Sequence, residues 1–176
     1  MKRLIVLIGL ALMAFAPPAA ARQEAFTATL SGHSVTSNTG SNATGSARIV
    51  IDTEARWVDI TLTVDGISRE ALWDTLVKAP MGPIHLHLYP SPDLSQTDGV
   101  VLVFPLPFGE NYRPTKAGFE VRVRRMSYAL GAKLLSSHAD FETLHRALES
   151  GAVVLNVHTN AFHDGEISGK VTPEKG

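Results

Sequence analysis

Hydrophobic and polar residues alternate in several short segments of this chain, as expected for β-strands that have one face in a core. Strands are predicted by this pattern over residues 26–30, 47–51, 57–64, 83–89, 119–124, 152–158 and 165–172. Residues 52–55 lie between the second and third of these segments and predict a hairpin. An unbroken apolar run over residues 100–104 predicts a further strand that is buried on both faces.

Two helices are expected in the connections between strands. Apolar residues at helical spacing predict a short helix over residues 68–78 with a serine cap. A second helix is expected at about 138–149, where Ser137 and Asp140 resemble a capping box and Gly151 follows the last apolar position.

Three segments rich in Gly, Pro, Ser, Thr or Asn predict surface loops, over residues 31–46, 90–99 and 105–118. Many short alternating strands, polar turns and few helices are typical of an all-β protein. We therefore predict an antiparallel Greek-key β-sandwich with one or two short helices in its connections.

Residues 1–21 have the features of a secretory signal peptide. Lys2 and Arg3 form a positive start, residues 4–15 are apolar, and small residues precede the expected cleavage after Ala21. No other stretch approaches the roughly 20 apolar residues of a transmembrane helix. The sequence therefore predicts a periplasmic or secreted protein without a membrane span, whose single domain covers residues 22–176.

The composition argues against several classes of protein function. Loss of Lys2 and Arg3 with the signal peptide changes the formal net charge from −1 to −3, which argues against nucleic-acid binding. The chain has no cysteine, so disulfides, thiolate catalysis and thiolate metal ligands are excluded. It also lacks the Gly-x-Ser-x-Gly and His-Glu-x-x-His motifs and a phosphate-binding glycine loop. A non-enzymatic protein is therefore expected.

Two of the expected strands carry histidine on one face. In residues 83–89, His85, His87 and Tyr89 share a face, and apolar residues occupy the other. In residues 152–158, His158 shares a face with an asparagine. Two histidines at His-x-His spacing lie about 7 Å apart at Cα in a strand, so their rings can converge on one cation.

Several motifs resemble those of the CHRD domain, the module first named from chordin. The stretches GAVVLNVHT (151–159) and DGEISGKV (164–171) resemble its closing strands, which typically read like YVNVHT and GEIRGQ. The sequence IHLH (84–87) is similar to its central HIHxG element, and residues 26–32 and 45–47 resemble its opening strands. The resemblance covers essentially the whole chain after the signal peptide.

The resemblance implies an exported β-sandwich, because the modules of chordin belong to an extracellular binding protein. The chain departs from the family pattern at three places. Tyr89-Pro90-Ser91-Pro92 replaces the usual glycine-rich turn, Ser168 stands where arginine is usual, and His163 occupies a turn position more often held by another residue.

Two interpretations of the histidines stay open. In the first, His85, His87 and His158 bind copper or zinc, with copper favoured by the general order of affinities. Candidates for a fourth ligand or a supporting group are His163, Tyr89 and Glu166. In the second, the histidines hydrogen-bond the backbone and each other and so define the register of the sheet. His33, His138 and His145 show no partner pattern and are expected at the surface.

Two functions follow from these interpretations. The first is an exported, non-enzymatic binding or scaffold domain of CHRD type, whose partner is an unidentified envelope or extracellular protein. The alternative is a mononuclear copper or zinc protein built on His85, His87 and His158, which could be redox active. Its His-x-His strand resembles that of copper-zinc superoxide dismutases, which are also Greek-key sandwiches. The sequence indicates no oligomeric state.

Overall fold

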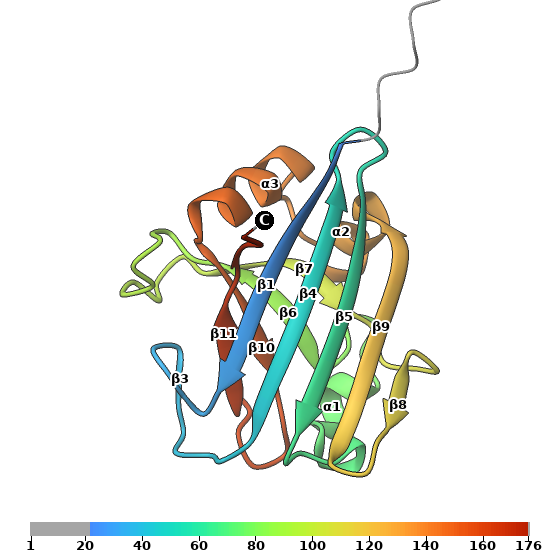
Figure 1. Cartoon of the computed structure of the whole chain (residues 1–176), viewed down its shortest axis with the longest axis vertical. Coiled ribbons are helices and arrows are strands. Elements are labelled where there is room, and N and C mark those ends of the chain that lie inside the picture. The colour runs from blue at the N-terminus through green and yellow to red at the C-terminus, as the bar shows by residue number, and fades with distance from the viewer. Residues whose placement is uncertain (1–21, 176) are drawn as a thin grey trace, which may run out of the picture.

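The computed structural model describes residues 22–175, so the predicted signal peptide lies outside the described residues. Within them, ten strands form one antiparallel sheet that curls around an apolar core, and two further strands form a small ribbon (Figure 1). The strands are β1 (Gln23–Ser31), β2 (His33–Ser34), β3 (Ser37–Asn38), β4 (Thr44–Asp52), β5 (Trp57–Asp65), β6 (Ile84–Leu88), β7 (Val101–Leu106), β8 (Tyr112–Pro114), β9 (Gly118–Ser127), β10 (Val153–Val157), β11 (Ile167–Lys170) and β12 (Thr172–Pro173). The helical segments are the 3-10 helix η1 (Arg69–Ala71), α1 (Asp74–Val77), α2 (Tyr128–Leu135) and α3 (Phe141–Ser150).

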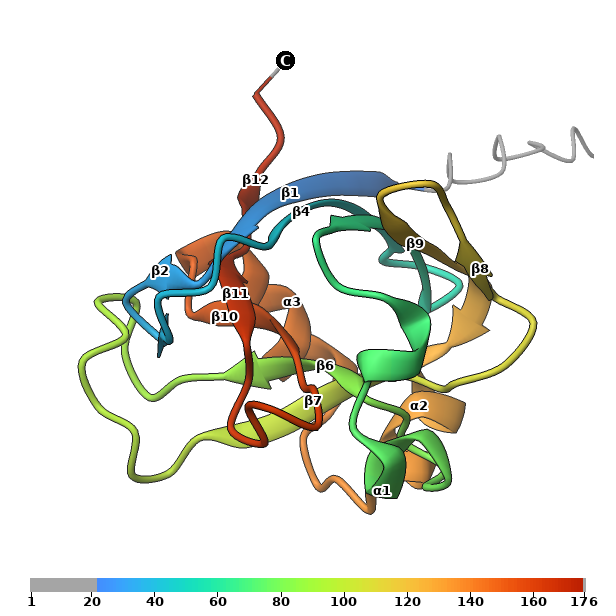
Figure 2. The same cartoon turned by 90° about the horizontal axis from the view of Figure 1, so that it is seen from below.

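The strand order in the sheet is β7-β6-β10-β11-β1-β4-β5-β9-β8, with β12 also beside β1. Strands β1, β4 and β5 are neighbours, and β11 returns from far along the chain to pair with the other side of β1. This order is of the Greek-key type. The predicted all-β antiparallel fold with short helices is confirmed, and its two layers come from one curled sheet (Figure 2).

The β4–β5 hairpin shows how alternation becomes packing. The two strands pair in continuous register from Thr44 with Asp65 to Asp52 with Trp57. The apolar positions of β5 that face the core have no exposed surface, namely Val58, Ile60, Leu62 and Val64. Thr61, between two of them, is exposed. The predicted hairpin and its inward face are therefore confirmed.

Residues 31–46 are not the fully solvated loop that their polar composition predicts. They contain β2 and β3, and the hydroxyls of Ser34 and Thr36 lie 2.5 and 2.6 Å from the hydroxyl of Ser168 on β11. Hydrogen bonds between hydroxyl groups attach this segment to the sheet. The pattern of hydrophobic residues gives no sign of such contacts.

The helices differ from the prediction in three ways. The expected helix over residues 68–78 is split into η1 and α1, and the side chain before η1 makes no capping hydrogen bond. The helix predicted from 138 begins at Phe141, because the Asp140 side chain accepts the backbone N–H of Thr143 at 2.8 Å and so caps α3. It ends at Gly151 as predicted. Helix α2 was not expected; Ser127 caps it by accepting the N–H of Leu130.

The apolar run over residues 100–104 is not buried on both faces. Strand β7 is the last strand of the sheet on its side, with β6 as its neighbour and α2 packed against it. Val101 at its start is 44% exposed, whereas Val103 and Phe104 are fully buried. A strand at the edge of a sheet that is partly covered by a helix can be as apolar as a central strand. Composition alone therefore does not show that β7 lies at the edge.

The segment from η1 to α1 packs against the end of β10. The backbone N–H of Trp73 donates to the carbonyl of His158 at 3.1 Å, and that of Asn160 donates to the carbonyl of Ala71 at 2.9 Å. Figure 2 shows α1 on the same side of the molecule as the β10–β11 turn. This packing covers the end of the sheet where the histidines lie.

Candidate metal centre

Strands β6 and β10 are direct antiparallel neighbours in the curled sheet. Their register pairs His85 with Asn156 and His87 with Val154, and the backbone N–H of His158 donates to the carbonyl of Pro83 at 3.0 Å. The alternate positions of both strands are buried in the core, namely Ile84, Leu86, Val153, Leu155 and Val157. The two histidine-bearing faces therefore point to the same side of the sheet, as the alternation predicts.

The three imidazoles form one cluster. Ring centroids are separated by 5.8 Å for His85 and His87, 5.1 Å for His85 and His158, and 5.7 Å for His87 and His158. One ring nitrogen of each histidine lies within 4.8 Å of the others. His85 is 2% exposed and His158 is 7% exposed, while His87 is half-buried. The fold thus gathers three nitrogen donors into a protected space.

The facing nitrogens have no hydrogen-bond partner. Both ring nitrogens of His85, Nε2 of His87 and Nε2 of His158 are buried without a partner among the described residues. They are half of all the unpaired buried side-chain nitrogen and oxygen atoms found there, so the unpaired atoms are concentrated at this cluster. Since buried polar groups are nearly always satisfied, this concentration requires an explanation. A register-defining hydrogen-bond network does not supply it.

The β10–β11 turn orients His158. Its Nδ1 lies 2.7 Å from the backbone carbonyl oxygen of His163. A carbonyl can only accept, so Nδ1 carries the proton and Nε2 presents its lone pair to the cluster. This backbone contact is one of the usual ways in which proteins orient a metal-binding imidazole.

Trp73 supports the same turn. Its ring stacks on the ring of His163 with centroids 4.2 Å apart and an interplanar angle of 11°, and lies 6.4 Å from that of His158. Because His163 supplies the carbonyl that orients His158, the stack also positions this imidazole. Sequence reasoning missed Trp73, since one tryptophan in a short apolar segment does not identify its partner.

The protein environment keeps the imidazoles neutral. Burial, together with the nearby His158 and His87, lowers the pKa of His85 from 6.5 to about 3, against the opposing effect of the Gly82 backbone. Burial and His158 lower the pKa of His87 to about 4. Burial also lowers the pKa of His158, against the opposing effects of the His163 carbonyl and Asp164. Metal ions bind the neutral imidazole, so the cluster has the required protonation state near neutral pH.

Three other residues that the sequence suggests for the site lie apart from this cluster. His163 is exposed and contributes its carbonyl to His158 while its ring stacks on Trp73. Tyr89 packs in a separate small apolar cluster. Glu166 accepts hydrogen bonds from the hydroxyls of Ser41 and Thr159, both at 2.7 Å. Neither His163 nor Glu166 is grouped with the three histidines among the described residues.

Asn156 supports the site from the opposite strand. Its Nδ2 donates to the carbonyl of Asp164 at 3.0 Å, and it pairs directly with His85. Gly165 leaves room for this side chain, because a Cβ at Gly165 would lie 2.0 Å from Asn156 Oδ1. Gly165 also has a φ of +117°, which favours glycine. The glycine after the turn is therefore a steric requirement of the site.

The cluster fits a first-row metal ion. With metal–nitrogen bonds of about 2.0–2.1 Å, the nitrogens of a three-histidine site lie roughly 3.5 Å apart. The present upper limit of 4.8 Å requires each nitrogen to move by less than about 1 Å, which small side-chain rotations provide. His85, His87 and His158 would hold the ion, and their imidazole donors suit copper and zinc.

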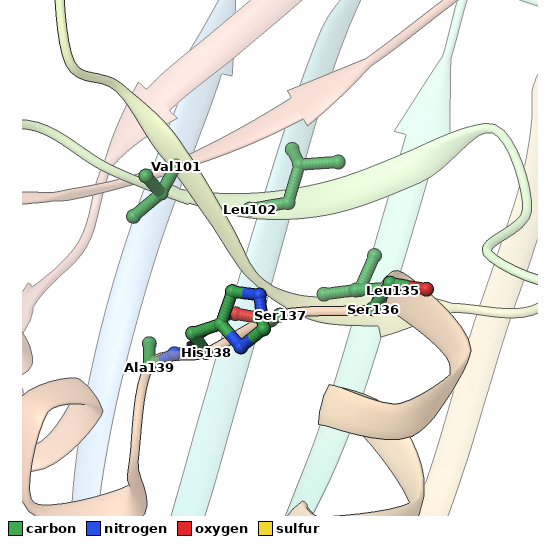
Figure 3. Close-up of a pocket in the computed structure, with 7 residues that line it drawn as sticks. All are labelled: Val101, Leu102, Leu135, Ser136, Ser137, His138 and Ala139. Atoms are coloured by element: carbon green, nitrogen blue, oxygen red, sulfur yellow. Dashed lines mark hydrogen bonds between the residues drawn. The ribbon is translucent and has the colours of Figure 1, made fainter.

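A separate pocket of about 300 Å³ lies at the start of β7, beside the segment that follows α2 (Figure 3). It is lined by Val101, Leu102, Leu135, Ser136, Ser137, His138 and Ala139. Its lining contains one ionisable side chain, that of His138, and so offers too few donors for a metal ion. The largest concentration of unpaired donors is therefore the histidine cluster and not this pocket.

The chain was compared with known protein families. The model of a family described as the CHRD domain matches residues 26–171, a range that includes β6, β10 and all three histidines. A search of curated proteins found no match.

Proposed function

The chain belongs to the CHRD domain family, and from that premise we propose that this member is an exported protein that binds one copper or zinc ion between β6 and β10. One observation carries the proposal: three imidazoles converge with buried, unpaired nitrogens. A scaffold function alone gives no reason to bury these nitrogens without partners, whereas a bound cation would satisfy them.

Each residue of the site has a defined role in this proposal. His85, His87 and His158 bind the ion, and the His163 carbonyl orients His158 through Nδ1. Trp73 and Gly165 hold the turn and the neighbouring amide in place. When bound, the ion supplies Lewis acidity or, if it is copper, a one-electron couple.

Export is part of the proposal and is supported by the signal-like residues 1–21. No helix among the described residues is long and apolar enough to cross a membrane. The non-enzymatic binding role expected from the sequence is compatible with a bound metal, because an ion can stabilise a domain that also binds another protein.

The test is the metal content of protein purified from its native compartment without a metal-binding tag. We expect one equivalent of copper or zinc per chain. His87→Ala should abolish binding with little effect on folding, because His87 is the least buried ligand. His138→Ala is the matched control, since His138 is exposed, lies in the connection between α2 and α3, and is not grouped with the three ligands. Equal metal binding by wild type and the folded His87→Ala protein would contradict the proposal.

A further inference from the structure

We propose that this centre is suited to a monovalent, three-coordinate ion and that it holds copper as Cu(I) in preference to Cu(II) or Zn(II). The inference rests on the proposed function and adds the charge and the coordination number of the ion. Two independent features of the site carry it: the number of available donors and the absence of a compensating charge within the cluster.

The first feature is the number of donors. Within residues 22–175, the cluster brings together three nitrogen donors and no carboxylate. The two oxygens of Glu166, the carboxylate candidate suggested by the sequence, already accept hydroxyl hydrogen bonds. Asn156 Oδ1 is unpaired on the same face, but a neutral amide oxygen suits harder ions such as Mg²⁺ or Ca²⁺.

The number of donors discriminates between ions. Zn²⁺ in proteins is almost always four-coordinate, with water as the fourth ligand in open sites. Here the facing nitrogens of all three histidines have essentially no solvent-accessible surface, so packing restricts a fourth ligand from solvent. Cu(I), a closed-shell d¹⁰ ion, forms stable complexes with three nitrogen donors. The site therefore matches the coordination number of Cu(I).

The second feature is the charge. All three ligands are neutral imidazoles, and the acidic group whose charge acts on His158 is Asp164, which is exposed. The solvation energy that an ion loses on burial grows with the square of its charge. A divalent ion therefore loses about four times as much as a monovalent ion of similar size, with no buried anion to offset the loss.

The experiment compares ions on the intact purified protein by chelator competition. Cu(I) is measured anaerobically under excess ascorbate against bicinchoninate, and Cu(II) and Zn(II) are measured in parallel against nitrilotriacetate. We expect the dissociation constant of Cu(I) to be at least 100-fold lower than those of Cu(II) and Zn(II). His87→Ala should lose this preference, while His138→Ala should retain it.

The outcomes separate this inference from the proposed function. If Cu(II) or Zn(II) binds as tightly as Cu(I), and His87→Ala weakens that binding, the inference is overturned and the metal site stands. If no ion binds, both fail. X-ray absorption of the wild-type Cu(I) protein gives a check that needs no variant: three nitrogen donors support the inference, and a fourth donor overturns it.

Discussion

Two groups of side chains in this protein bring possible ligand atoms equally close together but differ in their chemistry. The ligand atoms of His85, His87 and His158 lie within 4.8 Å of one another, and so do those of Glu24, His145 and Glu149. In the second group, His145 Nε2 is 2.8 Å from one oxygen of Glu24 and 3.7 Å from Glu149, and Arg22 lies 3.0 Å from the other oxygen of Glu24.

The difference lies in what the donor atoms already bind. The Glu24–His145–Glu149 group is a partly exposed network in which His145 is the partner of both carboxylates. A cation there would displace an existing hydrogen bond and compete with Arg22. The facing nitrogens of the histidine cluster have no such partners, so a cation replaces nothing. Proximity of potential ligands is therefore a weaker indicator of a metal site than buried donors without partners.

The largest expected effect separates the two groups directly. His158→Ala should weaken copper binding by more than about 100-fold, since even residues that only support metal ligands typically account for 10–100-fold. His145→Ala should change the affinity less than twofold. Anaerobic chelator competition for Cu(I) with both variants checks this, and a His145→Ala protein with the larger loss would reverse the comparison.

The second effect is the acid sensitivity of the metal-free protein. Because the folded-state pKa values of His85 and His87 are about 3 and 4, the unfolded chain binds protons first as the pH falls below 6.5. The contribution of these two neutral histidines to the free energy of unfolding is fully present above pH 6.5 and is lost as the pH falls toward 3. The loss is up to about 1.4 kcal/mol per pH unit for each histidine. Urea unfolding between pH 7 and pH 4 measures the slope.

A matched variant identifies the source of this slope. Replacing His87 by Leu removes one titrating group from the cluster, so the loss of stability with falling pH should become shallower. His33→Leu, at an exposed position of β2, should leave the slope unchanged. An unchanged slope in His87→Leu would mean that other groups cause the acid sensitivity.

Gly165→Ala should destabilise the protein by about 1–3 kcal/mol, because the new methyl group strains a positive φ and collides with Asn156. Thermal unfolding measures the change. Gly40→Ala is the control: Gly40 also has a positive φ, but a Cβ there has no atom within 4 Å. The difference between the two variants isolates the contact with Asn156, and equal losses would assign the whole effect to backbone strain.

Trp73→Ala should weaken metal binding by about tenfold, since the stacked ring supports the turn that orients His158. Trp73→Phe keeps an aromatic surface on His163 and should retain most of the affinity. The titration is done at one pH on variants whose circular dichroism matches the wild type. Equal affinity of Trp73→Ala and wild type would show that the stack does not position the ligand.

The smallest effect is expected at the second group. Glu24→Gln weakens the contacts with His145 and Arg22 and should change the free energy of unfolding by less than about 1 kcal/mol, as is usual for partly exposed ion pairs. Metal binding should be unaffected. A loss of copper affinity in this variant would make the second group the metal site.

The sequence and the tertiary structure contributed differently to the fold. Alternation predicted the hairpin of β4 and β5 and the inner faces of β6 and β10, because the side-chain period of a strand is a local property. It misplaced β7, whose exposure depends on which strands and helices lie beside it. It also missed α2, and it did not reveal that Glu24 is the partner of His145, which comes from a distant part of the chain.

The same division holds at the site. The sequence by itself determined that His85 and His87 share one face of a strand and that His158 ends another, since both follow from period two. Only the tertiary structure decided that these strands are neighbours, that the facing ring nitrogens are buried without partners, and that the carbonyl of His163 orients His158. These properties depend on long-range strand pairing and on turn packing. The binding of a metal remains the prediction that joins them.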